Sequence, residues 1–96
     1  MSNHVETILI IGIGMIGASI GLAAKQKGLK DYGYDLCESN IKFALDEKII
    51  NEGLDSLAQI SDEPLSNEIG LIIISVPPKQ TLDVLNNLYD IWNTEI

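Results

Sequence analysis

Two short apolar runs stand out in the pattern of hydrophobic and polar positions. Residues 7–12 (Thr-Ile-Leu-Ile-Ile-Gly) are rich in β-branched side chains and have no polar face. Residues 70–76 (Gly-Leu-Ile-Ile-Ile-Ser-Val) form a second run, which is closed by Pro77 and Pro78. Runs of this kind are typical of strands that are buried on both sides in a parallel sheet. We therefore expect a buried strand at each of these positions.

Helical spacing of apolar positions predicts three helices, over residues 15–27, 38–47 and 80–92. Gly28 is a candidate C-terminal cap for the first helix, and Ser39 is a candidate N-terminal cap for the second. The positions that the spacing places on the inner faces of these helices are Ile16, Ile20, Ala23, Ala24, Lys27, Ile41, Ala44, Leu45, Leu82, Leu85, Leu88, Tyr89 and Trp92.

The stretches between these elements are less strongly patterned. Residues 30–35 predict a second, shorter strand, and residues 49–53 predict a turn or a short strand. Residues 54–60 are apolar, whereas residues 61–68 are polar, contain Pro64 and predict a loop or a ragged helix. Strands thus alternate with helices, which implies right-handed crossovers and a parallel sheet with helices on both faces.

A glycine motif follows the first apolar run directly. Gly12, Gly14 and Gly17 have the spacing G-x-G-x-x-G, between an expected strand and an expected helix. Gly12 would allow a tight turn, Gly14 would let the backbone approach a diphosphate, and Gly17 would let the helix lie close on the strand. The motif alone is weak, but in this context it predicts a dinucleotide-binding loop.

The helix that begins at Met15 has no capping side chain and no carboxylate in its first turn. Its free N–H groups, including those of Met15 and Ile16, and the positive end of its dipole would therefore favour an anion, with water as the alternative. The uncharged residues 8–24 could also be interpreted as a membrane span, but the stretch is short for one and glycines interrupt it.

Asp35 ends the expected second strand, close to the roughly 20 residues after the glycine loop at which a ribose-binding carboxylate is expected. A carboxylate accepts hydrogen bonds from ribose hydroxyls and repels a 2′-phosphate, and the chain contains no arginine to hold such a phosphate. The sequence therefore predicts the nicotinamide dinucleotide NAD in preference to NADP. The alternative is that Asp35 only begins a turn before the next helix.

Ser75, Val76 and Pro77 lie at the carboxyl end of the last expected strand. Ligands of open α/β sheets bind beyond the carboxyl ends of the strands, so this segment, Gly12 and Asp35 should lie together. We interpret the segment as a second wall of the cofactor cleft, near the nicotinamide half. The alternative is an ordinary strand end at which proline stops the ladder.

The predicted fold class is α/β, a Rossmann-like doubly wound parallel sheet that is truncated.

Length, charge and cysteine content narrow the function further. Residues 1–96 make one domain at most, and we expect an incomplete NAD-binding domain because Rossmann-type domains usually have more strands. The formal net charge of −8 disfavours binding to nucleic acid or to an anionic membrane. Cys37 is the single cysteine, which excludes an internal disulfide and a zinc cluster and favours a reducing, cytoplasmic compartment. We interpret it as a small structural residue, and assign no catalytic or metal-binding role to any residue, His4 included.

Several segments taken together resemble prephenate and arogenate dehydrogenases, and the similarity covers about residues 8–88. The glycine loop is shared with many dehydrogenases, whereas the combination is more specific. The segments are residues 12–19, the Tyr-Gly-Tyr-Asp of residues 32–35, the Ile-Ile-Asn-Glu-Gly of residues 49–53, and residues 71–77 with Thr81 and Leu82 after them.

The resemblance implies NAD-dependent oxidative decarboxylation of prephenate or arogenate in tyrosine biosynthesis, by hydride transfer from the ring carbon that bears the hydroxyl. In that family a histidine binds this hydroxyl, arginines hold the carboxylates of a small dicarboxylate substrate, and a C-terminal helical domain forms a homodimer. The present chain has no arginine, and His4 lies outside the family's motif. The resemblance therefore implies the cofactor-binding portion of such an enzyme, inactive by itself.

Two other classes of protein remain open at this stage. Another Rossmann oxidoreductase, of the β-hydroxyacid dehydrogenase or imine reductase type, would share the same cleft. A non-enzymatic nucleotide-sensing module, like those that regulate potassium transport, would use a similar glycine loop and terminal aspartate. Such a module would assemble in response to an adenine nucleotide and would not require nicotinamide.

Overall fold

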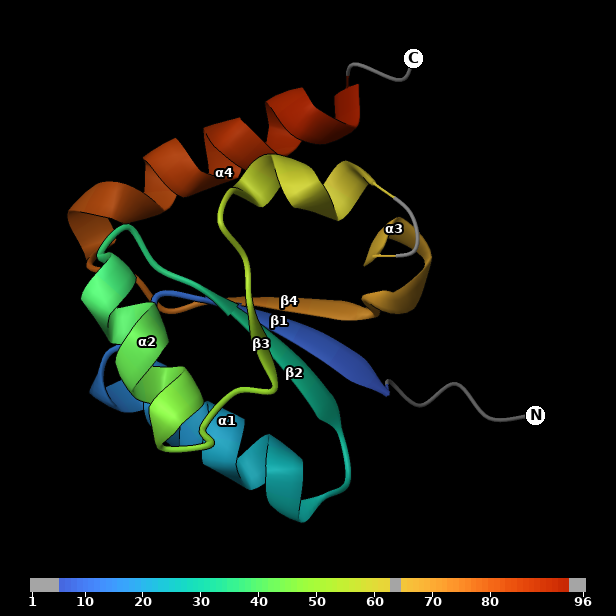
Figure 1. The fold of residues 1–96 in the computed structure, drawn as a ribbon. Helices are drawn as coiled ribbons and strands as arrows, with labels where there is room; N and C mark the ends of the chain where they lie inside the picture. Colours follow the sequence, from blue (N-terminus) through green and yellow to red (C-terminus); the bar gives the residue numbers. More distant parts are fainter. Residues whose placement is uncertain (1–5, 63–64, 94–96) are drawn as a thin grey trace.

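The computed structural model of the chain describes residues 6–62 and 65–93, with the side chains of Trp92 and Asn93 excepted. In this part of the chain four strands form one sheet in the order β3-β2-β1-β4, and every neighbouring pair is parallel (Figure 1). The strands are β1 (Thr7–Ile11), β2 (Lys30–Tyr34), β3 (Glu52–Gly53) and β4 (Leu71–Ile74).

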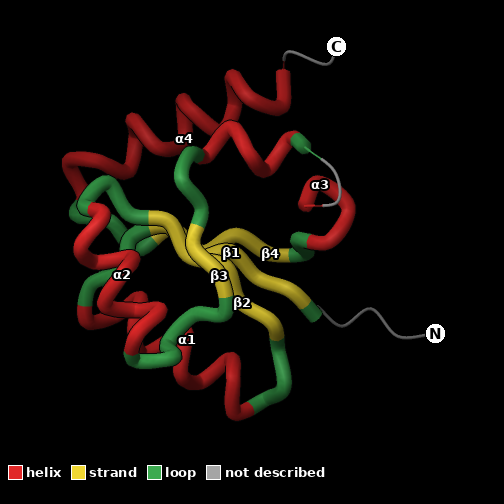
Figure 2. The backbone as a smooth tube through the Cα atoms, viewed as in Figure 1, coloured by secondary structure: helices red, strands yellow, loops and turns green. Residues whose placement is uncertain are grey.

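Helices cover both faces of the sheet (Figures 1 and 2). Helices α1 and α2 lie on one face, and η1, α3 and α4 lie on the other. The predicted α/β fold with a parallel sheet between two helical layers is therefore confirmed. The helices are α1 (Met15–Gln26), α2 (Glu38–Asp46), the 3₁₀ helix η1 (Leu57–Ser61), α3 (Leu65–Glu68) and α4 (Pro78–Asn93).

Strand β1 is the centre of the core, because all five of its residues are buried. Its side chains alternate between the two layers, as the period of a strand requires. Leu9 and Ile11 belong to the cluster on the α4 side, whereas Ile8 and Ile10 pack with Ala24 of α1. Each of these buried leucine and isoleucine side chains stabilises the fold by roughly 1.5–3 kcal/mol relative to an exposed one. The prediction of a strand without a polar face is confirmed.

Several expected boundaries differ from those observed. The strand expected over residues 70–76 is shorter, and only Glu52–Gly53 of residues 49–53 pair as a strand. Ser39 was expected to cap α2, but the N-cap residue is Cys37 and Ser39 already lies inside the helix. Gly28 has a φ of 81°, and the backbone N–H of Leu29 reaches the carbonyl of Ala24, so α1 does end in a glycine turn as expected.

The expected inner face of α1 is wrong in part. Ile16 is 71% exposed, and the buried residues of the helix are Gly17, Gly21 and Ala24, which repeat at helical spacing. A methyl group at Gly21 would lie 2.7 Å from the carbonyl oxygen of Ile49. The glycine row thus lets the backbone of α1 approach its neighbours closely, and close packing outweighs the burial of a larger side chain.

The expected inner face of α4 is also wrong in part. Only Leu88 of the expected stripe is buried among the residues whose side chains are described, whereas Leu82 is 65% exposed and Tyr89 is 64% exposed. Val84 and Ile91 complete the face that packs on the core. Both rows of α4 are apolar at helical spacing, so the pattern could not choose between them. Trp92, the last residue of the expected stripe, has a side chain outside the described part.

A polar cluster joins β2 to neighbouring segments at the amino end of the sheet. Asp31 is fully buried, and the backbone N–H of Asn51 donates to its Oδ1 at 2.9 Å. The side chain of Asn51 accepts from the backbone N–H of Asp31 at 2.8 Å, and Lys25 Nζ lies 3.5 Å from the carboxylate. The connection between α2 and β3 is thereby fixed against β2.

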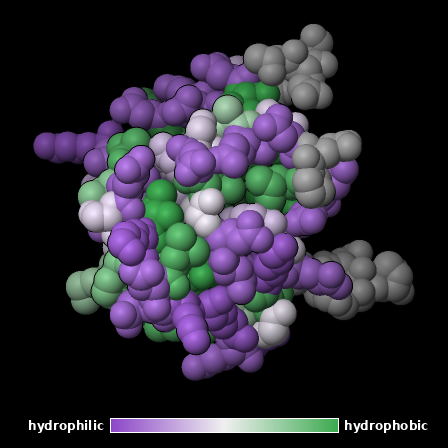
Figure 3. Space-filling view, viewed as in Figure 1, coloured by the Kyte–Doolittle hydropathy of each residue, from purple (hydrophilic) through white to green (hydrophobic). Residues whose placement is uncertain are grey.

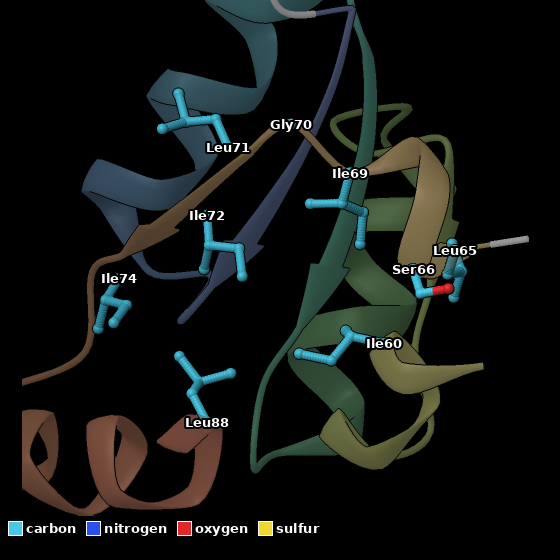
Figure 4. Close-up of a pocket in the computed structure, with 9 residues that line it drawn as sticks. All are labelled: Ile60, Leu65, Ser66, Ile69, Gly70, Leu71, Ile72, Ile74 and Leu88. Carbon is cyan, nitrogen blue, oxygen red and sulfur yellow. The ribbon is translucent and has the colours of Figure 1, made fainter. Parts of the chain in front are cut away.

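An apolar cavity of about 370 Å³ lies between β4, η1, α3 and α4 (Figure 4). Ile60, Ile72 and Leu88 contribute to its lining from three different elements.

The face seen in Figure 3 is mostly hydrophilic, with hydrophobic side chains gathered along its middle. Among the residues that the structure describes, no helix has the length and apolar character to cross a membrane. The uncharged stretch over residues 8–24 is divided between β1 and α1.

Candidate functional site

The carboxyl ends of β1, β2 and β4 converge at one edge of the sheet, at the left of Figure 1, where α1, α2 and α4 begin. The backbone N–H of Gly12 donates to the carbonyl of Tyr34 at 2.8 Å. From the other side, Ser75 Oγ donates to the carbonyl of Gly12 at 2.5 Å, and the Ser75 backbone N–H donates to Ile11. The expectation that these strand ends lie together is therefore confirmed.

The turn out of β1 requires glycine at two positions for reasons internal to the chain. Gly12 has a φ of 98°, which L side chains rarely adopt, and a Cβ there would lie 2.8 Å from the backbone of Ser75. A Cβ at Gly17 would meet the carbonyl oxygen of Gly12 and would lie 2.9 Å from Ser75 Oγ. The expected roles of these two glycines, a tight turn and a close helix, agree with this geometry.

Gly14 differs from both of these glycines. Its φ of −99° is open to any residue, and a Cβ built on it would find no protein atom within 4 Å. Packing within the chain therefore gives no reason for glycine at this position. The bare backbone of Gly14 faces open space at the edge where the strand ends converge.

The amino end of α1 presents free donors next to Gly14. Gly14 is the N-cap residue and has no side chain to cap the helix, and no acidic residue lies in the first turn. The first hydrogen bond along the helix runs from the backbone N–H of Ala18 to the carbonyl of Gly14 at 2.8 Å. The N–H groups of residues 15–17 therefore have no partner within the helix, and this positive end is suited to an anion. Met15 and Ile16 are 89% and 71% exposed beside it.

Asp35 lies directly after β2, and three donors hold its partly buried carboxylate. The backbone N–H of Ile13 donates to Oδ2 at 2.7 Å, so the carboxylate is tied to the glycine turn. The backbone N–H of Cys37 donates to Oδ1 at 2.9 Å, and Asn40 Nδ2 donates to the same oxygen at 3.2 Å. Sequence reasoning did not identify Ile13 or Asn40, because these contacts depend on how α2 starts beneath the turn.

A groove of about 470 Å³ opens beside Asp35, between the end of β2, helix α2 and the segment after β3. Besides Asp35, its lining includes three other acidic residues, Glu38, Asp46 and Asp55. Lys42 also lines the groove, but its ammonium lies 3.1 Å from Asp46 and is paired with it. The surroundings of Asp35 are therefore predominantly anionic, which disfavours a phosphate there.

Cys37 is exposed at the N-cap of α2, so it does not fill the core as a small structural residue would. A hydrogen bond with the hydroxyl of Ser39, at 2.9 Å from the sulfur, lowers the pKa of its thiol below the ordinary value. The backbone N–H groups of Asn40 and Ser39 act in the same direction. These contacts favour the thiolate, because they are donors at the positive end of a helix.

The segment after β4 has mixed roles. The hydroxyl of Ser75 is directed at the carbonyl of Gly12 and supports the glycine turn. Val76 is partly buried, and its Cγ1 would lie 2.8 Å from a methyl group at Gly12. Pro77 is exposed, and its carbonyl accepts the backbone N–H of Gln80 at the start of α4. All three residues lie at the converging edge, as expected.

Over residues 6–62 and 65–93, no three His, Cys, Asp or Glu side chains gather as a metal site would require. His4 lies outside the described residues.

Comparison with known proteins finds similarity to dehydrogenases. No protein-family model matches the chain. The chain is 36% identical over 90 residues to a prephenate dehydrogenase of Bacillus subtilis (strain 168), which covers 92% of this chain and 23% of that protein. The chain therefore spans about a quarter of the length of this curated relative.

Two solved structures have the same fold. One is prephenate dehydrogenase from A. aeolicus in complex with hydroxyphenyl propionate and NAD⁺, with a TM-score of 0.80, 29% identity, and coverage of 95% of this chain and 31% of that one. The other is Synechocystis arogenate dehydrogenase, with a TM-score of 0.75, 21% identity, and coverage of 88% and 28%. The chain is thus similar in sequence to the N-terminal portion of prephenate dehydrogenases, and it shares the fold of the corresponding portion of arogenate dehydrogenase.

Proposed function

We propose that the chain is the NAD-binding portion of a dehydrogenase of the prephenate and arogenate type. The single observation that carries the proposal is the open backbone of Gly14, next to the uncapped amino end of α1 and across the turn from Asp35. A dinucleotide diphosphate suits bare backbone and a helix amino end, and ribose hydroxyls suit a carboxylate. The similarity to an A. aeolicus enzyme in complex with NAD⁺ supports the same cofactor.

NAD, when bound, would supply the hydride acceptor. The residues of this chain would bind and orient it: the glycine turn and the first turn of α1 at the diphosphate, Asp35 at the adenosine ribose, and the segment after β4 as a second wall. The proposed cofactor-binding residues are Gly12, Gly14, Met15, Ile16, Gly17, Asp35, Ser75, Val76 and Pro77.

The anionic groove beside Asp35 supports NAD over NADP as the cofactor. A 2′-phosphate about 4 Å from this carboxylate would cost roughly 4 kcal/mol before screening, at an effective dielectric constant of about 20. We therefore expect the chain to bind NAD at least tenfold more tightly than NADP. Calorimetric titration of the two dinucleotides under identical conditions measures this preference. Equal or tighter binding of NADP would contradict the assignment.

The reaction of the parent enzyme would be oxidative decarboxylation of prephenate or arogenate, with a dicarboxylate substrate, a homodimeric assembly and a cytoplasmic location. The present chain spans 23–31% of its relatives and contains no arginine to hold the substrate carboxylates. We therefore expect the 96-residue chain to bind NAD without turning over prephenate. Absorbance at 340 nm follows the formation of NADH, and a sustained rate above that of a protein-free control would contradict this expectation.

A further inference from the structure

We propose that Asn40 is a positioning residue, which fixes the Asp35 carboxylate for the adenosine ribose and so contributes to the affinity for NAD. The proposal rests on the proposed function and deepens it. Asn40 lies in the first turn of α2 and is exposed, and its amide Nδ2 donates to Asp35 Oδ1 at 3.2 Å.

The three donors of Asp35 divide unequally between its two oxygens. Oδ1 accepts from Asn40 and from the backbone of Cys37, whereas Oδ2 accepts only from the backbone of Ile13 among the described residues. A carboxylate offers about four lone-pair positions, two on each oxygen. Oδ1 is therefore satisfied by the protein, and the acceptor position that remains for a ribose hydroxyl is on Oδ2.

Asn40 provides the side-chain part of this arrangement. The Ile13 and Cys37 donors are backbone groups, which persist in any variant that folds. Without the amide of Asn40, Oδ1 would have a free acceptor position open to water, and the carboxylate would lose one of the three donors that fix its orientation. Ordering the carboxylate before binding lowers the entropic cost of binding, so its loss should weaken binding without removing a direct contact.

The test compares two ligands in two proteins. We expect Asn40→Ala to weaken NAD binding roughly fivefold, as calorimetry measures it, which is less than the full value of a hydrogen bond to a charged group because Asn40 does not contact the ligand itself. Binding of 2′-deoxy-NAD, which lacks the hydroxyl that pairs with this carboxylate, should change less than twofold. Alanine is favourable within a helix, so the variant should unfold at the same temperature as the wild type. An equal loss for both ligands, or no loss for NAD, would overturn the proposal.

Two further variants sharpen this comparison. Asn40→Asp keeps the shape of the side chain but replaces the amide donor with a second anion beside Asp35. NAD should therefore bind to this variant no more tightly than to Asn40→Ala. Asn86→Ala removes an exposed asparagine from α4 and should leave both affinities unchanged. A wild-type chain that binds neither ligand would count against the proposed function as well. If the wild-type chain binds NAD and the Asn40 variants bind it equally well, only the role of Asn40 is contradicted.

Discussion

At the scale of single residues, the glycine motif combines two different physical requirements. Gly12 is needed by the fold, because its φ is positive and the backbone of Ser75 leaves no room for a side chain. Gly14 is not needed by packing, because a side chain there would meet open space. The same three-glycine motif therefore contains two positions that packing requires, Gly12 and Gly17, and one, Gly14, that leaves open space beside the backbone.

Alanine substitutions should separate these two requirements. We expect Gly12→Ala to lower the free energy of unfolding by about 1–3 kcal/mol, because alanine is strained at a φ of 98°. Gly14→Ala should cost less than about 1 kcal/mol, the difference between the two residues as helix N-caps, yet weaken NAD binding roughly tenfold by steric overlap. Urea denaturation and calorimetry measure the two effects. A Gly14→Ala variant that binds NAD like the wild type would show that the ligand does not approach this backbone.

Sequence reasoning identified Asp35 from its distance along the chain to the glycine loop, but not the donors that surround it. The carboxylate receives a hydrogen bond from Ile13, which is far from it in sequence, and one from Asn40, which lies in the first turn of α2. A polar residue in the first turn of a helix after a strand-ending aspartate is a weak signal by itself. The contact exists because α2 starts beneath the turn, and this is a property of the tertiary structure.

At the scale of elements, the period of the apolar positions predicted the helices correctly but not always their inner faces. In α4 the row of Leu82, Leu85 and Tyr89 and the row of Val84, Leu88 and Ile91 have the same helical spacing. The second row packs on the core, whereas Leu85 on the first row is 48% exposed. Docking against η1 and the sheet decides between the rows, and neither propensity nor period contains that information.

This choice of face predicts unequal effects of two leucines on the same helix. Leu88→Ala should lower the free energy of unfolding by about 2–5 kcal/mol, because the side chain is 5% exposed and its loss would enlarge the neighbouring cavity. Leu85→Ala is the matched control and should cost less than about 1 kcal/mol. Urea denaturation of both variants tests the orientation of α4. Equal losses, or a larger loss at Leu85, would mean that the helix docks through its other face.

At the scale of the whole molecule, the sheet order brings the site together. The order β2-β1-β4 places the ends of three parallel strands side by side, although Gly12, Asp35 and Ser75 are distant in sequence. At the opposite edge, the buried Asp31 and the exposed Asn51 exchange two hydrogen bonds, which fix the connection that leads from α2 into β3. The structure is thus held at the amino edge, while the carboxyl edge keeps exposed backbone, where we propose that the cofactor binds.

The sequence by itself determined the fold class, the positions of β1, β2, β4, α1, α2 and α4 within a few residues, and the identity of the strand-end residues. These follow from local physics: β-branched apolar runs favour buried strands, helical spacing favours helices, and parallel strands place their ends at one edge. Only the tertiary structure decided which rows of α1 and α4 are buried, that Ser75 supports Gly12, and that Asn40 and Ile13 hold Asp35. These depend on contacts between residues far apart in the chain or across an element boundary, and such contacts leave no periodic trace in the sequence.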